Sequence, residues 1–320
     1  MNEISENCCY LDFQAVPPAI FRGGILCIGN FDGVHLGHQS LLAKAKELGQ
    51  KHAAPVVPVT FDPHPMQLLA PASFQTPLTT IPQRVQLLQR VGADRVVILA
   101  TTPALLSLSP EYFFETIVRF SLQARGIVEG FNFRFGKDRA GNNELLEQWC
   151  RQNQIDFCQF PAISHRSDVV STSRIRCKIA EGDFSSVTEL LGRPYSIKGT
   201  VVSGAKRGRT IGFPTANLAQ IATMLPPPGV YASEVIVGNQ AHAAAVNIGG
   251  NPTFGELQPK VEVHLIDFAG DLYGQSLELA LIAAIRPVKQ FQDATELIAQ
   301  IHTDIQQAKN LFTTMKAPQR

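Results

Sequence analysis

The string with the clearest chemistry begins at Gly29 and reads GNFDGVHLGH. It follows an apolar run that predicts a buried strand and leads directly into a pattern that predicts a helix. His35 and His38 are three residues apart with Gly37 between them, so both rings can face one phosphate near the helix start. Histidine N–H groups there could stabilise the charge that builds on an α-phosphate as pyrophosphate leaves. The string therefore predicts a nucleotidyl-transfer site.

A second phosphate-binding candidate begins at Ser171 and reads STSRIR. A hydroxyl side chain that caps a helix leaves N–H groups pointing outward, and nearby arginines add positive charge for phosphate oxygens. By itself the string is equally typical of an ordinary capped helix.

The second half of the chain contains a basic, glycine-rich segment that ends at Thr215 and Asn217. Magnesium prefers hard oxygen ligands, which a threonine hydroxyl and an asparagine carbonyl can supply. Because GxxxxGK[ST] is absent, we do not expect a P-loop kinase. The alternating run VEVHLIDF places Glu262 on one face of a predicted strand, where it could take a proton from a substrate hydroxyl. A solvated turn and a solvated glutamate are the alternatives.

The elements that must position these residues differ between the two halves. In the first half, apolar runs alternate with helical patterns, which predicts a doubly wound parallel α/β sheet. After about residue 190, short strand-like runs separated by Gly and Pro predict a mostly antiparallel β-barrel, and an amphipathic pattern predicts a C-terminal helix. We place the boundary between residues 186 and 187, which gives domains 1–186 and 187–320.

Composition excludes several classes of protein. Lys and Arg total 28 against 27 Asp and Glu among 320 residues, so no global charge favours nucleic acid or a membrane surface. No apolar run is long enough to span a bilayer, and the N-terminus does not resemble a secretory signal, which predicts a cytoplasmic protein. The six cysteines form no CxxC pair, and we expect Cys8 and Cys9 to lie in a flexible tail. The oligomeric state stays open.

The motifs of both halves resemble one known family. GNFDGVHLGH is similar to the HxGH nucleotidylyltransferases, in the wording of their FAD synthetase branch, and TFDPHP, GFNFRFG and STSRIR follow in that branch's order. GTVVSGAKRGRTIGFPTANL, PPPGVYASEV, AVNIGGNPTF and VEVHLIDFAGDLYG resemble the riboflavin kinase domain, also in order. The chain is therefore similar to the bacterial bifunctional riboflavin kinase/FAD synthetases.

This resemblance implies two reactions with small-molecule substrates: riboflavin and ATP give FMN and ADP, and then FMN and ATP give FAD and diphosphate. It implies catalytic roles for His35, His38 and Glu262, and a Mg²⁺ ion that accompanies ATP and is held by Thr215 and Asn217. The implied ATP-binding residues are Gly29, Asn30, Phe31, Asp32, Gly37, Ser171, Thr172, Ser173, Arg174, Arg176, Gly204, Arg209 and Thr215. The implied flavin-binding residues are Asp62, Asn132 and Arg286.

The chain departs from the family pattern at three places. The family's SSTRIR reads STSRIR here, the segment after the third predicted strand lacks acidic and aromatic residues, and the glutamate after Arg286 and Pro287 is replaced by Val288. Two other functions stay open: a flavin- or nucleotide-binding regulator without turnover, and a nucleotidylyltransferase for another substrate.

Overall fold

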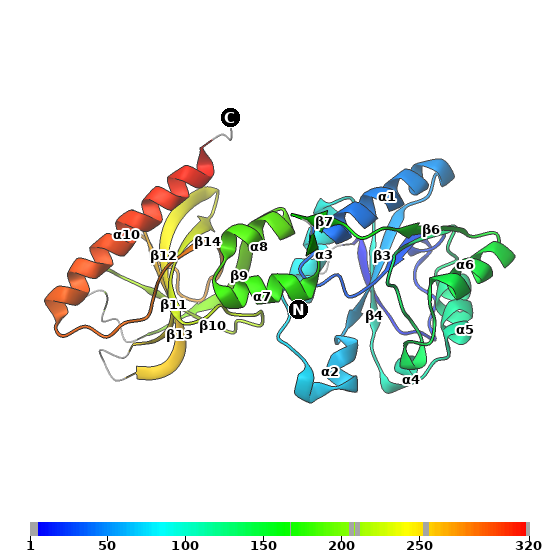
Figure 1. The fold of residues 1–320 in the computed structure, drawn as a ribbon, viewed down its shortest axis with the longest axis horizontal. Helices are drawn as coiled ribbons and strands as arrows, with labels where there is room; N and C mark the ends of the chain where they lie inside the picture. The colour runs from blue at the N-terminus through cyan, green and yellow to red at the C-terminus, as the bar shows by residue number, and fades with distance from the viewer. Residues whose placement is uncertain (1–5, 167, 205–207, 209–211, 252–255, 318–320) are drawn as a thin grey trace. The chain divides into compact units, whose positions relative to one another are not determined.

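The computed structural model describes residues 6–166, 168–204, 208, 212–251 and 256–317 (Figure 1). Its internal packing divides the chain into two compact units. The first unit contains the residues up to Gln75 together with Thr79–Ser171. The second contains Thr76–Leu78 and the residues from Thr172 onward.

The first unit is built on a six-stranded sheet in which every neighbouring pair is parallel, in the order β1-β4-β3-β2-β5-β6. The strands are β1 (Cys8–Leu11), β2 (Ile25–Ile28), β3 (Val56–Asp62), β4 (Val96–Ala100), β5 (Gly126–Gly130) and β6 (Asp156–Phe160). A short antiparallel pair, β7 (Ser164–His165) and β8 (Asp168–Val169), follows them. The predicted parallel α/β sheet is confirmed.

Helices cover both faces of this sheet (Figure 1). They are η1 (Ala19–Phe21), α1 (Leu36–His52), α2 (Pro65–Leu69), η2 (Pro71–Ser73), α3 (Ile81–Arg90), α4 (Pro103–Leu106), α5 (Pro110–Phe113), η3 (Phe114–Ser121), η4 (Lys137–Arg139) and α6 (Asn143–Gln152). On one face, Leu42 of α1 and Leu88 of α3 pack in a buried cluster with Ile98. On the other, Phe114 of η3 and Leu146 of α6 pack in a second cluster, so the sheet is buried on both sides.

The strand order places a topological switch point beside β2. The chain adds β3 and β4 on one side of β2 and later places β5 and β6 on the other. Open α/β sheets bind ligands at the carboxyl ends of the strands where the order reverses. The GNFDGVHLGH string begins at this position, directly after Ile28.

The N-terminal segment differs from its prediction. Cys8–Leu11 forms β1 and pairs in parallel with Val96–Leu99 at the edge of the sheet. The expectation of a flexible tail was wrong because pairing with β4, which lies far away in the sequence, supplies the hydrogen bonds that so short a strand cannot form by itself.

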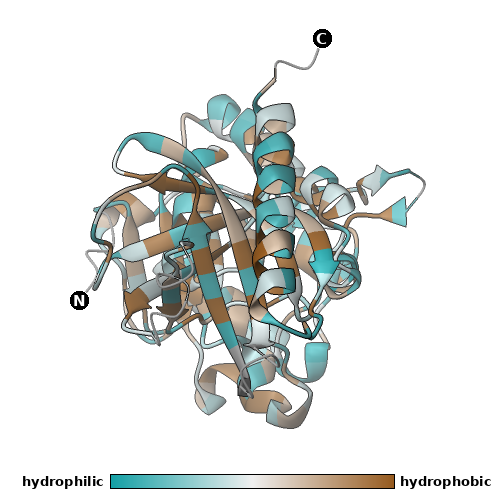
Figure 2. Ribbon diagram, turned by 90° about the vertical axis from the view of Figure 1, so that its left-hand side faces the viewer, coloured by the Kyte–Doolittle hydropathy of each residue, from teal (hydrophilic) through white to brown (hydrophobic). Residues whose placement is uncertain are grey.

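The second unit contains a closed antiparallel barrel in the order β10-β13-β12-β11-β14-β9. The strands are β9 (Tyr195–Val202), β10 (Ala216–Ala219), β11 (Gly229–Val237), β12 (Gln240–Asn251), β13 (Glu256–Leu265) and β14 (Ser276–Pro287). The C-terminal helix α10 (Ala294–Lys316) lies across the barrel strands (Figure 2). Ala308 of α10 packs with Ala232 and Ala243 of the barrel. The predicted barrel and closing helix are confirmed.

Two helices, α7 (Thr172–Glu181) and α8 (Phe184–Leu191), precede the barrel within the second unit. The ring of Phe184 is buried and makes an edge-to-face contact with Tyr231, at 5.6 Å between centroids. The predicted boundary at residues 186 and 187 therefore lies inside α8. Packing alone does not test where the two activities separate along the chain, so that boundary stays a prediction.

An ion pair fixes α10 on the barrel. Arg286 of β14 donates from Nε to both carboxylate oxygens of Asp304, at 3.1 and 3.0 Å, and from Nη2 to Oδ2 at 2.8 Å. Asp304 is only 3% exposed. We expect Asp304→Ala to lower the free energy of unfolding by about 3 kcal/mol, because it leaves a partly buried guanidinium without its carboxylate.

Lys309→Ala is the matched control on the same helix, because Lys309 pairs with Asp267 at the surface. Exposed pairs contribute about 1 kcal/mol or less. Urea denaturation of both variants measures the difference. Equal destabilisation by the two substitutions would contradict a special role for the Arg286–Asp304 pair.

Candidate active sites

The loop after β2 has an unusual backbone. Phe31, Gly33 and Val34 have φ angles of 48°, 80° and 42°. Glycine adopts this left-handed region readily, but for Phe31 and Val34 it costs about 1 kcal/mol or more each. Both side chains are buried. The surrounding structure must therefore hold the loop in this conformation.

Asp32 is the centre of the network that holds the loop. Its Oδ1 accepts hydrogen bonds from Thr79 N at 3.0 Å and from Thr79 Oγ1 at 3.2 Å. Gly33 N is 3.2 Å from Thr79 Oγ1, so the loop and residue 79 are joined twice. Asp32 is 4% exposed and does not line the nearby cavity. Its predicted contact with ATP stays a prediction, whereas its contacts with the protein are structural.

A buried arginine that the sequence analysis did not single out completes this network. Arg84 of α3 donates from Nη1 to Thr60 Oγ1 at 3.1 Å, and its Nη2 lies 3.7 Å from Asp32 Oδ1. Thr60 Oγ1 donates in turn to the carbonyl of Asn30 at 3.0 Å. Burial lowers the pKa of Arg84. One desolvated cation thus connects α3, β3 and the loop.

The two histidines lie together at the start of α1. His35 is the N-cap, and its Nδ1 accepts a hydrogen bond from His38 N at 3.3 Å. Their rings stack with centroids 3.6 Å apart, and the Phe31 ring meets His38 edge-on at 5.1 Å. A Cβ atom at Gly37 would lie 3.1 Å from His35 Cε1, so the glycine leaves room for the buried His35 ring.

His38 is electrically neutral in this setting. Burial lowers its pKa well below the ordinary value, and the neighbouring His35 and Arg84 lower it further. Its Nδ1 atom is buried without a hydrogen-bond partner among the described residues. A neutral imidazole with an unused polar atom can bind a ligand group at this point.

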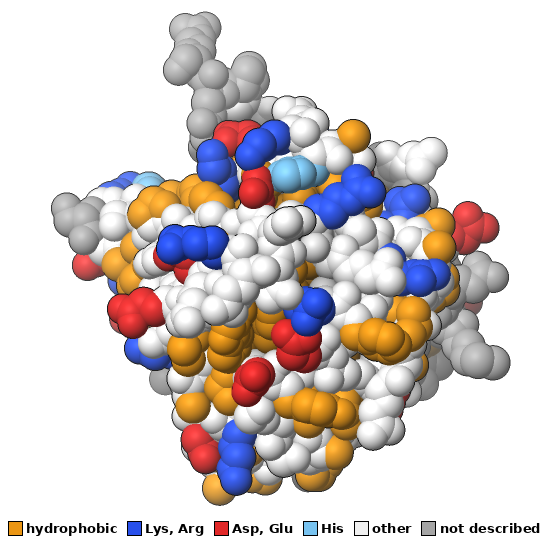
Figure 3. All heavy atoms as spheres, turned by 90° about the vertical axis from the view of Figure 1, so that its right-hand side faces the viewer, with side chains coloured by type: hydrophobic (Ala, Val, Ile, Leu, Met, Phe, Trp, Pro, Cys, Tyr) orange, Lys and Arg blue, Asp and Glu red, His pale blue; other side chains and the backbone are white. Residues whose placement is uncertain are grey.

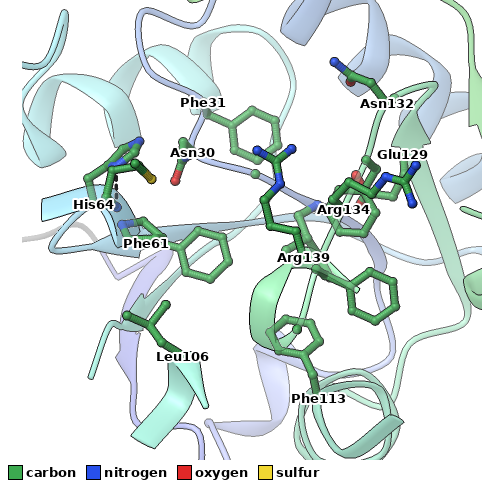
Figure 4. A pocket seen from close by; sticks show the side chains of 18 of the residues that line it. Asn30, Phe31, Phe61, His64, Leu106, Phe113, Glu129, Asn132, Arg134 and Arg139 are labelled. Carbon is green, nitrogen blue, oxygen red and sulfur yellow. Dashed lines mark hydrogen bonds between the residues drawn. The ribbon is translucent and has the colours of Figure 1, made fainter. Parts of the chain in front are cut away.

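A cavity of about 470 Å³ opens at the carboxyl ends of β2, β3 and β5 (Figure 4). Its volume falls in the range typical of small-molecule sites. Five predicted site residues line it: Gly29, Asn30, Phe31, His38 and Asn132. The Oδ1 atom of Asn30 is buried there without a partner in the described part of the chain.

Sequence reasoning missed much of the cavity wall. The unpredicted polar lining residues are His64, Glu129, Arg134, Asp138 and Arg139. The unpredicted aromatic ones are Phe61, Phe113, Phe133 and Phe135. Several of these residues belong to the TFDPHP and GFNFRFG strings. Their position in those motifs could have identified them as lining residues.

Asp62, predicted to bind flavin, lies at the end of β3 but does not line the cavity. Its Oδ2 accepts a hydrogen bond from the Tyr10 hydroxyl at 2.8 Å. Burial, followed by this bond to Asp62, raises the pKa of Tyr10 to about 12. Flavin binding by Asp62 stays a prediction.

The STSRIR string crosses the boundary between the compact units. Ser171 belongs to the first unit, and the rest of the string begins α7 in the second. Thr172, Ser173, Arg174 and Arg176 therefore lie on the first turns of α7. Arg176 donates to the backbone carbonyl of Thr76, which is part of the same second unit. The ATP-binding role of these residues stays a prediction.

In the second unit, the barrel brings several predicted residues together. Asn217 of β10 pairs with Glu262 of β13, so the two side chains are cross-strand neighbours. A Cβ atom at Gly204 would lie 2.1 Å from Asn217 Nδ2, and one at Gly208 would lie 3.3 Å from Thr215 Oγ1. At Gly204 a Cβ atom would force Asn217 to shift, and at Gly208 it would also lie 2.3 Å from the carbonyl oxygen of Phe213. Arg209 lies outside the described residues.

Thr215 and Asn217 suit magnesium because they offer neutral, hard oxygen atoms beside a closely approaching backbone. Among the residues that the structure describes, no group of three or more His, Cys, Asp or Glu side chains could hold a metal. An ion at this place would therefore share its coordination with nucleotide oxygens and water.

Arg286 is engaged by the protein itself. Besides its bonds to Asp304, its guanidinium lies 5.6 Å from the centroid of the Phe291 ring. These contacts join Arg286 of β14 to Asp304 of α10 and to the ring of Phe291. Flavin binding by Arg286 stays a prediction.

Comparisons with known proteins match both units. A family model described as FAD synthetase matches residues 18–174, and one described as riboflavin kinase matches residues 191–312. The two units are thus of the kinds that transfer nucleotidyl and phosphoryl groups. The chain belongs to the family of bifunctional riboflavin kinase/FMN adenylyltransferases, because it shares 34% identity over 92% of its length with the relative of that name from Escherichia coli (strain K12), of which 95% is covered.

Two further relatives extend the likeness. The bifunctional riboflavin kinase/FMN adenylyltransferase of Bacillus subtilis (strain 168) is 33% identical over 91% of this chain and 93% of its own. A crystal structure described as a macrolide-efflux protein from Streptococcus pneumoniae superimposes with a TM-score of 0.84 at 29% identity, over 95% of this chain and 99% of that one. The likeness therefore covers both units, while efflux belongs to the description of that protein alone.

Within the described ranges, none of the helices combines the length and the apolar character needed to cross a bilayer.

The neutral state of His38 can be tested through Arg84. In Arg84→Met the pKa of His38 should rise toward the ordinary value of about 6.5, because a neighbouring positive charge is removed. NMR titration of the His38 ring measures this shift. Arg90→Met, at an exposed position of the same helix, should leave the titration unchanged. If the two variants titrate alike, Arg84 does not control the charge of His38.

Because the pKa of His38 is lowered in the folded protein, the free energy of unfolding must depend on pH. Above about pH 6.5 the ring is neutral in both the folded and the unfolded chain. As the pH falls below this value, only the unfolded chain takes up the proton, and folding loses free energy.

Proposed function

We propose that the two reactions of this bifunctional riboflavin kinase/FMN adenylyltransferase are divided between the two units. The second unit phosphorylates riboflavin, and the cavity of the first adenylylates the resulting FMN. The observation that carries this division is that each unit has its own cluster of polar groups. His35 and His38 stack beside the first cavity, and Asn217 and Glu262 pair on the barrel.

In adenylyl transfer, a phosphate oxygen of FMN attacks the α-phosphorus of ATP and pyrophosphate leaves. The attacking group comes from the substrate, so no protein nucleophile is needed. The task of the protein is to orient both substrates and to stabilise the charge that develops on the α-phosphate. We assign that stabilisation to a hydrogen bond from the neutral His38 ring, which His35 holds by stacking. Arg134 and Arg139 supply positive charge to the same cavity.

In riboflavin phosphorylation, the substrate hydroxyl attacks the γ-phosphorus of ATP, the bond from that phosphorus to the β,γ-bridging oxygen breaks, and ADP leaves. Glu262 takes the proton of that hydroxyl as general base. Thr215 and Asn217 would hold a magnesium ion, which when bound neutralises phosphate charge. Gly204 and Gly208 allow the backbone to lie against these side chains.

The alternative functions make different demands on the chain. A flavin-binding regulator does not need a stacked histidine pair with an unused ring nitrogen, and a nucleotidylyltransferase for another substrate does not need a riboflavin-kinase-like unit. Incubation of the purified protein with riboflavin, ATP and magnesium, followed by chromatography of the flavins, separates the three. FMN and FAD together support the proposal, whereas unchanged riboflavin contradicts it.

We also propose that the enzyme works in the cytoplasm on small molecules only, without nucleic acid. Basic and acidic side chains are interspersed over the face drawn in Figure 3, and no single sign dominates that face. This distribution agrees with the net charge of +1, and the described residues on that face offer no extended electrostatic footprint for a polyanion.

We expect His38→Ala to reduce FAD formation by about 10²–10³-fold, because it removes one preorganised donor to the α-phosphate. FMN formation by the second unit should persist. His52→Ala is the matched control, since His52 lies at the far end of the same helix and binds Asp156. FMN and FAD output from one preparation, with a thermal melt, measures both effects. FAD formation within about tenfold of the wild type would refute the assignment.

We expect Asn217→Ala to abolish riboflavin phosphorylation, because loss of a metal ligand should raise that barrier by several kcal/mol. Adenylylation of supplied FMN should continue. Asn310→Ala, at an exposed position on α10, is the control. The two activities are assayed separately, with riboflavin or with FMN as the substrate. A variant that still makes FMN at nearly the wild-type rate would show that Asn217 is not a ligand.

A further inference from the structure

Glu129 is a buried carboxylic acid in the wall of the first cavity. It lies in β5, one residue before the strand ends at Gly130, and is 2% exposed. Its Oε1 accepts a hydrogen bond from Ile28 N at 2.6 Å, at the place where the GNFDGVHLGH loop begins. It lines the cavity together with Asn132 and Arg134, and Figure 4 draws all three on the same side. Neither the motifs nor the reaction described above uses this residue.

The surroundings of Glu129 favour its uncharged form. Burial raises its pKa well above the ordinary value, and the bond from Ile28 opposes this only in part. Two thiols on neighbouring elements lie close to Glu129: Cys27 of β2 and Cys150 of α6. Burial raises the pKa of each thiol, so both are neutral. The ionisable groups that line the same cavity are His38, His64, Arg134, Asp138 and Arg139.

The end of β5 is held firmly in place. Asn143, the first residue of α6, donates from Nδ2 to the carbonyls of Gly130 and Phe131, at 2.9 and 3.1 Å. On its other side, the strand is joined to the loop by the bond from Ile28 to Glu129. The carboxyl group of Glu129 is therefore preorganised, which is what a specific hydrogen bond to a ligand requires.

We propose that Glu129 is a specificity-determining residue of the adenylylation site, which donates a hydrogen bond from its second carboxyl oxygen to the heterocycle of a substrate. One oxygen is used by Ile28, and a protonated carboxyl group has one O–H donor to give. The cavity walls include the flat rings of Phe31, Phe61, Phe113, Phe133 and Phe135, against which a planar heterocycle can pack.

The acceptor is a ring carbonyl or an unprotonated ring nitrogen. Adenine and the flavin ring both carry such an atom, so the experiment must distinguish ATP from FMN. A site that donates to a buried acceptor discriminates strongly against a ring that lacks it. This inference rests on the proposed function of the first unit.

Two variants test it. Glu129→Val removes both the acceptor for Ile28 and the donor, whereas Glu129→Gln keeps an acceptor oxygen and offers an uncharged NH2 group as the donor. Glu147→Gln, at an exposed position on α6, is the control. For each protein, KM and kcat are measured with ATP varied at saturating FMN and with FMN varied at saturating ATP. Riboflavin phosphorylation and a thermal melt report folding.

We expect Glu129→Val to raise the KM for one substrate about tenfold, because the loss of one buried hydrogen bond weakens binding by about that factor. The kcat should change less than about threefold. Glu129→Gln should match the wild type near neutral pH. A rise in KM for ATP alone identifies adenine as the partner, and a rise for FMN alone identifies the flavin. Unchanged KM values, or an equal rise in both, would overturn the inference.

The pH dependence gives an independent test if Glu129→Val does not fold. The protonated form of Glu129 is the donor, and burial raises its pKa, so the wild type should lose affinity for the identified substrate as the pH rises through that raised pKa. Glu129→Gln has no proton to lose there, so the ratio of wild-type to variant kcat/KM should fall. A ratio that stays constant up to the highest pH at which the enzyme remains folded would overturn the inference. Wild-type FAD formation would still stand, and so would the proposed function.

Discussion

The first unit depends on how its loop is held after β2. Phe31 and Val34 have left-handed backbone conformations that are costly for non-glycine residues, and the buried Asp32–Thr79–Arg84 network holds the loop in this shape. That network can form only because the strand order brings β3 and α3 beside the loop at the topological switch point. Once the loop is fixed, His35 caps α1 and the ring of His38 stacks on it beside the cavity.

Desolvation sets the charge of two side chains in the first cavity, His38 and Glu129. In the first cavity, burial lowers the pKa of His38 and raises the pKa of Glu129, so both side chains favour their neutral forms there. The arginines of the wall then supply the positive charge. In the barrel, the paired Asn217 and Glu262 combine a neutral oxygen with a carboxylate, which suits metal-assisted phosphoryl transfer.

The sequence predicts those features that depend on local patterns or on whole motifs. The alternation of apolar runs and helices predicts the parallel sheet, and the HxGH string at a strand end predicts that both histidines lie at the start of the next helix. The stacking of their rings was not predicted. The features that the sequence does not predict depend on contacts between residues far apart in the chain. Glu129 meets Ile28 across a separation of 101 residues, and Arg84 reaches Thr60 from another element. A glutamate within an apolar strand and an arginine within a helical pattern have no local signature that reveals such partners.

The central claim is that one chain transfers two different phosphorus atoms of ATP to the same flavin, and isotopic labelling tests it most directly. The purified enzyme is supplied with riboflavin, magnesium and ATP labelled at either the γ- or the α-phosphorus, and the flavins are separated over time. Label from the γ position should appear first in FMN and then in FAD, because the phosphate of FMN is retained. Label from the α position should appear in FAD alone. Label from the α position in FMN, or no γ label in any flavin, would contradict the account.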